Sequence, residues 1–320
     1  MHINSFNQEN LCARKDILAT LAYFNMFDYP LKKREIVAFL GHSHEAHEFD
    51  HALNLLIDES AVFKVGEFYS LHNNFSLSER RTRGNAKAAF MLKKANKVAT
   101  VISWFPYVKG VAVSGSLSKN FADDTADIDF FIIAAANRLW IARTFLHLFK
   151  KLTFLVNMQH YFCMNYFIDE AAPEIVEKNI YTAVEIATLM PLRGSVVFEK
   201  FFAANSWTKN FLPNNYMRVS SAKEISGNIF KFIVEKLLNN RMGDQLDSFF
   251  MKMTDKSWSA KTKRKKKNSR GVLMSLHAAK HYSKPDPANF QYKLLQLYEN
   301  NLADIFNQYE LSSRLTNELQ

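Results

Sequence analysis

The sequence predicts an α+β protein in which helices flank a central mixed sheet. Apolar residues recur at helical spacing near both ends of the chain, and short β-branched runs gather between residues 108 and 168. Only nine Gly and seven Pro interrupt 320 residues that are 48% hydrophobic, which argues against disorder. A chain of this length can bury a sizeable core, and we expect two or three compact units.

Three helices are predicted at the N-terminus. The first has apolar residues at helical spacing from Ile17 onward and ends before Pro30, because proline disfavours helix at the preceding residue. The second covers residues 32–40 and is ended by Gly41, and the third covers about 45–59.

A hairpin follows these helices, with two short strands in residues 62–71 that turn near Gly66. Helix, helix, helix, hairpin is the order of a winged helix-turn-helix, so we assign residues 1–75 to a domain of this kind. One functional interpretation is DNA binding through the third helix. That helix carries five acidic side chains and almost no Lys or Arg, so a packing or substrate-positioning module is the preferred interpretation.

The second unit, residues 76–215, is predicted to begin with a long amphipathic helix and to continue as strand, loop, strand, helix, strand. These elements are expected at 77–104, 108–114, 128–133, 139–152 (capped by Asn137) and 161–168. The rest of the chain looks mainly helical, with helices at 174–190, about 222–239 and 289–310. We therefore expect residues 216–320 to form a helical C-terminal region.

A basic run at 261–270 accounts for most of the net charge of +10. Seven of the 41 Lys and Arg residues fall in it, and without them the chain has 34 basic against 31 acidic residues. Such a run is usually a solvated, mobile loop. The alternative is a contact for nucleic acid or another anionic partner.

The motif that carries chemistry lies between the first two strands of the second unit. Gly115-Ser116 follows an apolar strand, where glycine lets the backbone approach a phosphate and the serine hydroxyl can donate to it. In the next strand, alternation places Asp127 and Asp129 on one side, about 7 Å apart. Paired carboxylates suit Mg²⁺ or Mn²⁺, which complete their shells with water and substrate phosphate.

These residues resemble the signature of the DNA polymerase β nucleotidyltransferase superfamily, in which Gly-Ser is followed after about ten residues by Asp-x-Asp. Here ten residues separate Gly115-Ser116 from Asp127-Ile-Asp129. The resemblance is specific over about 108–133 and weaker over 77–215. It implies that Gly115 and Ser116 hold a nucleoside triphosphate, that Asp127 and Asp129 hold the metal, and that Lys119 stands where the family often has Arg.

The sequence departs from the family at two positions. Ala126 replaces a serine, which is a minor change. The family's third carboxylate lies on a later strand, where this chain has Asn165. An amide oxygen can coordinate a metal but cannot act as a general base. Asp169 shares the strand parity of Asn165, but it lies about 13 Å further along unless a bulge shifts the register.

A second motif, His47-Glu-Phe-Asp-His51, matches the His-Glu-x-x-His pattern of zinc proteases, with His42 and His44 nearby. The buried face of this helix is defined by Phe49 and the apolar residues that follow it. At 100° per residue His47 and His51 lie nearly opposite that face. We therefore expect them to face solvent.

Composition places the protein in a reducing cytoplasm. Cys12 and Cys163 are far apart and form no CxxC pair, so neither a disulfide framework nor a thiolate zinc site is indicated. The N-terminus lacks a signal-peptide stretch, and the longest apolar region, 128–149, is interrupted by charged residues, so no membrane association is expected.

Together these observations predict a Mg²⁺-dependent enzyme that transfers a nucleoside monophosphate from an NTP to an acceptor that the sequence leaves unidentified. The basic run favours an anionic acceptor. The alternative is a catalytically degenerate protein that keeps the fold and binds a nucleotide or nucleic acid as a regulator.

Overall fold

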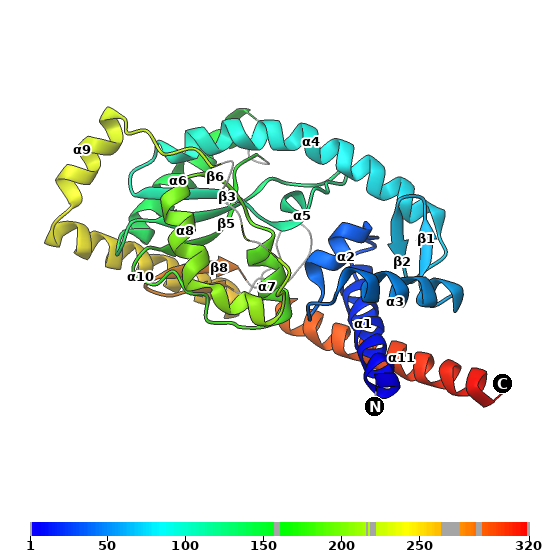
Figure 1. The fold of residues 1–320 in the computed structure, drawn as a ribbon. Coiled ribbons are helices and arrows are strands. Elements are labelled where there is room, and N and C mark those ends of the chain that lie inside the picture. The colour runs from blue at the N-terminus through cyan, green and yellow to red at the C-terminus, as the bar shows by residue number, and fades with distance from the viewer. Residues whose placement is uncertain are drawn as a thin grey trace.

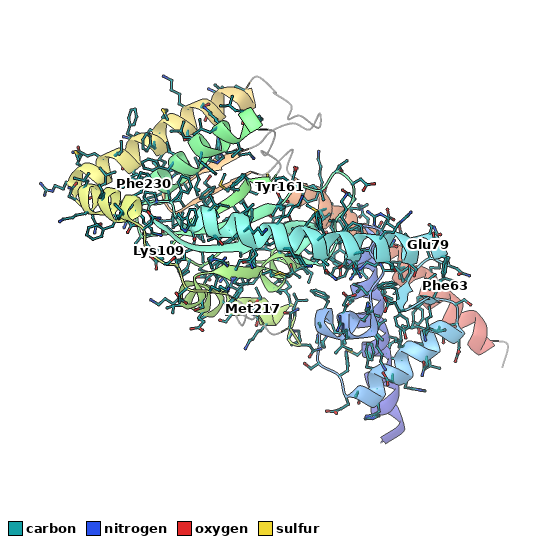
Figure 2. The ribbon with its side chains drawn as sticks, turned by 90° about the horizontal axis from the view of Figure 1, so that it is seen from above. Phe63, Glu79, Lys109, Tyr161, Met217 and Phe230 are labelled. Carbon is teal, nitrogen blue, oxygen red and sulfur yellow. The ribbon has the colours of Figure 1, made fainter. Side chains whose placement is uncertain are left out.

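The computed structural model describes residues 2–156, 161–215, 217, 222–263, 276–285 and 290–318. It has the expected α+β architecture, in which helices pack on both faces of a mixed sheet (Figure 1). A long helix, α4, runs along the molecule. Figure 2 shows Phe63 of the N-terminal hairpin near one end and Phe230 of α9 at the other, with α4 between them.

The N-terminal unit has the predicted order of three helices and a hairpin. Its elements are α1 (His2–Asn25), α2 (Lys33–Phe39), α3 (Ala46–Asp58), β1 (Phe63–Val65) and β2 (Phe68–Ser70). Gly66 makes the hairpin turn with a φ of 66°, a left-handed conformation that glycine adopts without steric cost. The first helix begins well before the expected start, because its polar first turns give no periodic apolar signal.

Helix α4 (Phe75–Ser103) connects this unit to the sheet. Asn74 caps it by accepting a hydrogen bond from Ser76 N. Arg81 is 1% exposed, bonds Glu35 of α2 at 2.7 Å and lies over the ring of Tyr29. The buried guanidinium therefore links α4 to the N-terminal helices.

Among the described residues, the large sheet has six strands in the order β6-β3-β4-β5-β8-β7. β4 runs parallel to β5, and the other neighbouring pairs are antiparallel. The strands are β3 (Val108–Val113), β4 (Asp129–Ala134), β5 (Cys163–Asp169), β6 (Met190–Arg193), β7 (Leu276–Ala278) and β8 (Tyr282–Pro285).

Different helices cover the two faces of the sheet. One face buries Phe130 and Ile132 against α4 and α6, and the other buries Phe131 and Ile133 against α7 and α8. The remaining helices are α5 (Gly115–Ser118), α6 (Leu139–Thr153), α7 (Ile180–Ala187), α8 (Ser195–Ala204), α9 (Ile229–Leu238), α10 (Arg241–Lys263), α11 (Phe290–Glu318) and the 3₁₀ turns η1 (Phe154–Val156) and η3 (Ser206–Asn210).

The structure corrects the expectation of a mainly helical C-terminal region at residues 216–320, in which no strand was predicted. Strands β7 and β8 pair with each other, and β8 pairs with β5, so they extend the central sheet across the expected domain boundary. Strand β6 was also missed, because its four residues follow α7 closely and the helix predicted at 174–190 extended to its first residue, Met190. Lys261–Lys263 end helix α10, and the rest of the basic run lies outside the described residues.

The start of α6 differs from the prediction as well. Asn137 is not its cap, because Asn137 has a φ of 56° and the capping position falls on Arg138. The cap comes from a distant residue instead, since Asp247 of α10 accepts a hydrogen bond from Ile141 N at 2.9 Å. Burial raises the pKa of Asp247 to about 6.

The first and last helices of the chain lie together. Helices α1 and α11 pack against each other, and Tyr309 joins the core of the N-terminal unit (Figure 1). The N-terminal unit is therefore completed by residues from the last helix.

Candidate active site

The end of β3 and the start of β4 bring Gly115 and Asp129 into contact. The antiparallel register pairs Val113 with Phe130, and Ser114 N donates to Asp129 O at 2.9 Å. Gly115 has a φ of 68°, and a Cβ there would lie 2.9 Å from Asp129 Oδ2. Glycine is therefore required both by the backbone conformation and by the carboxylate packed against it.

A bulge in β5 aims Asn165 at the same carboxylate. Asp129 pairs with Cys163, Phe130 with Met164 and Phe131 with Tyr166, so Asn165 is the extra residue. Its Nδ2 donates to Asp129 Oδ1 at 2.6 Å. The residue at the position of the expected third carboxylate thus lies beside Asp129, but as an amide.

Asp127 lies in the segment just before β4 rather than within the strand. Strand alternation therefore does not set its direction, in contrast to the expectation. Cys163 of β5 pairs with Asp129 in the sheet. Burial and then the charge of Asp129 raise the pKa of the Cys163 thiol to about 12, with a smaller contribution from Asp127. Cys163 therefore stays a neutral thiol at neutral pH and is not a nucleophile.

The other two predicted nucleotide-binding residues lie on or next to the short helix α5. Ser116 is exposed. The Nζ of Lys119 bonds Glu185 of α7 at 2.7 Å and the Gly115 carbonyl at 3.2 Å. The hydroxyl of Tyr29 donates to the Lys119 carbonyl, so the N-terminal unit contacts the motif directly.

A pocket of about 310 Å³ opens beside Asp129, on the face of the sheet covered by α7. Of the predicted site residues, Gly115, Asp129 and Asn165 line it, whereas Ser116, Lys119 and Asp127 lie outside the lining. The lining residues are Ser114, Gly115, Asp129, Phe131, Asn165, Tyr166, Ile175, Glu177, Tyr181, Thr182, Glu185, Ile186, Leu189, Lys284, Phe290 and Gln291.

Sequence reasoning missed three charged lining residues, Glu177, Glu185 and Lys284, and the polar lining residue Gln291. Glu185 pairs with Lys119, and Glu177 pairs with Lys284 at 2.5 Å. No local motif marks these residues, because α7, β8 and α11 reach the pocket only through the tertiary fold. The sequence does show that the glutamates and lysines carry opposite charges, but only the tertiary fold shows which of them pair.

Asp169 does not supply the missing carboxylate. It pairs with Ala134, whereas Asp129 pairs with Cys163 at the other end of the strand. Its side chain is fully buried, accepts from Asn137 N at 3.0 Å and bonds His281 Nδ1 at 3.0 Å. Asp169 therefore anchors the β5 end and the segment before β8.

The His-Glu-x-x-His motif lies on the outside of α3, as expected. His47 and His51 are exposed, whereas Phe49, Ala52, Leu53 and Leu56 are buried. The two histidines therefore do not face a cleft of the N-terminal unit.

Comparisons with protein-family models, curated proteins and solved structures find no match to this chain. In the part of the chain that the structure describes, none of the helices combines the length and apolar character needed to span a bilayer.

Proposed function

We propose that the chain is a nucleotidyltransferase of the DNA polymerase β type that uses Mg²⁺ or Mn²⁺ to transfer a nucleoside monophosphate from an NTP to an acceptor. The observation that carries the proposal is the position of Asp129, which lies between Gly115 and Asn165 at the edge of the pocket. Gly115 and Asp129 are the first and last residues of the segment that resembles the family signature, and they lie in contact with each other.

The charge of the pocket supports a requirement for a cation. Its described lining carries the carboxylates of Asp129, Glu177 and Glu185 and the ammonium of Lys284. Such a surface would repel a triphosphate unless a divalent cation joined the two. Carboxylate and amide oxygens are hard ligands of the kind Mg²⁺ prefers, so Asp129, Asn165 and Asp127 fit this ion.

The residues of the site would then have separate roles in binding the metal and the nucleotide. When bound, the cation supplies charge neutralisation on the phosphates. Asp127 and Asp129 would hold it, and Gly115 lets the backbone come close to the substrate. Release of Lys119 from Glu185 would free an ammonium for the triphosphate. The apolar side of the pocket, which includes Phe131, Tyr166 and Ile186, would exclude water from the bound nucleotide.

A second candidate is a nucleotide- or nucleic-acid-binding regulator that has the same fold without the chemistry. The hydrogen bond from Asn165 to Asp129 favours it, because an amide at this position cannot take a proton from the acceptor hydroxyl. In both cases we propose that residues 1–75 form a winged-helix module that packs against the catalytic unit. The contacts of Arg81 with Glu35 and of Tyr29 with Lys119 support this packing role.

Calorimetry tests the proposal. The full chain is titrated with each NTP in Mg²⁺, in Mn²⁺ and in chelator, and compared with the double variant Asp127→Ala/Asp129→Ala. The matched control is Asp123→Ala/Asp124→Ala, which removes two exposed carboxylates from the same segment. We expect metal-dependent binding in the wild type and the control and at least a tenfold loss in the test variant. Absence of binding to every nucleotide, or unchanged binding in Asp127→Ala/Asp129→Ala, would contradict it.

A further inference from the structure

A second cluster of potential metal ligands lies in the N-terminal unit, away from the pocket. Cys12 and Asp16 are one turn apart on α1, and His44 lies in the segment between α2 and α3. One ligand atom from each of these three residues lies within 4.8 Å of the other two. Residues from two separate parts of the chain thus converge on one point.

Asp16 is the centre of this cluster. Its Oδ2 lies 2.8 Å from His44 Nε2 and 2.9 Å from His42 Nδ1. The side chains of Asp16 and His44 are 13% and 8% exposed, so both are held in place by packing, while His42 is open to solvent. Small movements of these side chains would separate the ligand atoms enough to admit an ion with bonds of about 2.0–2.3 Å.

The ligand types select the ion. A thiolate, an imidazole and a carboxylate are the groups that bind Zn²⁺, whereas Mg²⁺ takes oxygen ligands. Many tetrahedral zinc sites take two ligands from residues one turn apart on a helix and a third from another segment. His42 contacts Asp16 but does not belong to the group of mutually close ligand atoms, so water would take the fourth position.

We propose that Cys12, Asp16 and His44 bind a zinc ion, with water in the fourth position. The ion would replace the hydrogen bond between Asp16 and His44 and fix α1 to the segment between α2 and α3. This site is separate from the Asp129 pocket, so it stands whether or not the chain is a nucleotidyltransferase. It also differs from the His47 and His51 motif, whose side chains point to solvent.

Cobalt titration tests the site, because Co²⁺ bound to a thiolate gives a charge-transfer band in the near ultraviolet and a tetrahedral site gives strong visible bands. The full chain, without a polyhistidine tag and freed of metal under reducing conditions, is titrated with Co²⁺ and then with Zn²⁺. We expect one Co²⁺ per chain with a thiolate band, and displacement by an equimolar amount of Zn²⁺.

Variants assign the ligands. Cys12→Ser should remove the thiolate band, and His44→Ala should weaken binding at least tenfold. Cys163→Ser and His47→Ala/His51→Ala are the matched controls and should behave as wild type. Because Cys12 is exposed, Cys12→Ser is expected to fold even if His44→Ala does not, and circular dichroism checks both.

A melting experiment gives a second readout. Zn²⁺ should raise the melting temperature of the wild type and of Cys163→Ser but not of Cys12→Ser. The proposal would be overturned by weak binding without a thiolate band, or by a band that survives in Cys12→Ser. Loss of binding only in His47→Ala/His51→Ala would move the metal to the outer face of α3 and would overturn it as well.

Discussion

The amide of Asn165 donates a hydrogen bond of 2.6 Å to the carboxylate of Asp129 across two parallel strands. This contact depends on the bulge in β5, which adds Asn165 to the strand without shifting the pairing of Cys163 with Asp129. The third position of the motif is therefore structurally present and chemically altered.

Asn165→Asp would place two carboxylates where one amide and one carboxylate now bond. Without metal they repel each other, so the variant should be less stable and should bind a proton between them. When Mg²⁺ is present, both carboxylates can coordinate it, and we expect the affinity for Mg²⁺ to rise about tenfold or more. Calorimetry with Mg²⁺ and melting with and without Mg²⁺ measure both effects.

Asn74→Asp is the control for Asn165→Asp, because it adds the same charge at a helix cap where Asn and Asp are equivalent. A gain in pyrophosphate release by Asn165→Asp would identify an enzyme that has lost its third carboxylate. If Asn165→Asp changed neither stability nor metal affinity, Asn165 and Asp129 would not share a cation site.

Gly115→Ala should disrupt the site at little cost to the fold. The new Cβ would meet Asp129 Oδ2 at 2.9 Å, and alanine is strained at a φ of 68°. We expect a loss of about 1–2 kcal/mol in unfolding free energy and at least a tenfold loss of metal-dependent nucleotide binding. Denaturant melts and calorimetry measure the two effects.

Gly227→Ala is the control, because nothing lies within 4 Å of a Cβ built there. It should keep the stability and binding of the wild type. Equal binding by Gly115→Ala and Gly227→Ala would show that the backbone at 115 does not approach the nucleotide.

Asp247→Asn should stabilise the protein at pH 7.5, should stabilise it less at pH 5.0, and should have little effect below the ordinary pKa of an aspartate, near pH 3.5. Burial raises the folded-state pKa of Asp247 to about 6, so the stability it contributes is present at low pH and is lost as the pH rises through 6. The amide resembles the protonated acid and still accepts from Ile141 N. We expect a gain of about 1 kcal/mol at pH 7.5 after allowance for solvent screening.

Chemical denaturation at several pH values between 3.5 and 7.5 measures the effect of Asp247→Asn. The difference from wild type should be nearly constant above pH 7 and should shrink as the pH falls from about 6 towards 3.8. A difference that stayed constant with pH would contradict the prediction. It would show that the Asp247 carboxylate is ionised over the whole pH range and caps α6 as a charged group.

Arg81→Ala should separate the N-terminal unit from α4. The guanidinium is buried, bonds Glu35 at 2.7 Å and lies 3.6 Å from the centre of the Tyr29 ring. Its loss leaves a half-buried carboxylate and an apolar gap, and we expect about 3 kcal/mol of destabilisation. Arg83→Ala, on the exposed side of the same helix, should cost less than 1 kcal/mol, as is typical of surface charges.

Local patterns in the sequence were sufficient for the N-terminal unit and for the signature motif. The turn at Gly66, the end of α2 before Gly41 and the outward direction of His47 follow from neighbouring residues, because helix period and turn chemistry act over a few residues. The two strands that flank the motif were predicted for the same reason, whereas the contact between Gly115 and Asp129 was not, because the connection between β3 and β4 runs through helix α5.

Contacts between distant segments were not predictable in this way. Strand β8 has no partner near it in the sequence except β7, and its pairing with β5 is set by the tertiary fold. The cap of α6 comes from Asp247, and Lys119 is held by Glu185, each more than sixty residues away. Asp127 was placed in a strand that begins at Asp129, because an apolar residue between two carboxylates looks like strand alternation.

Two features of the fold depend on segments that are synthesised late. One is the packing of α1 on α11, and the other is the side of the pocket formed by β8 and α11. Lys284, Phe290 and Gln291 are synthesised after every other pocket residue, so a nascent chain lacks a complete pocket until then. Helix α1 can pack on α3 early, but it gains its α11 neighbour only after α11 is made. Contacts of such long sequence separation favour slow final folding.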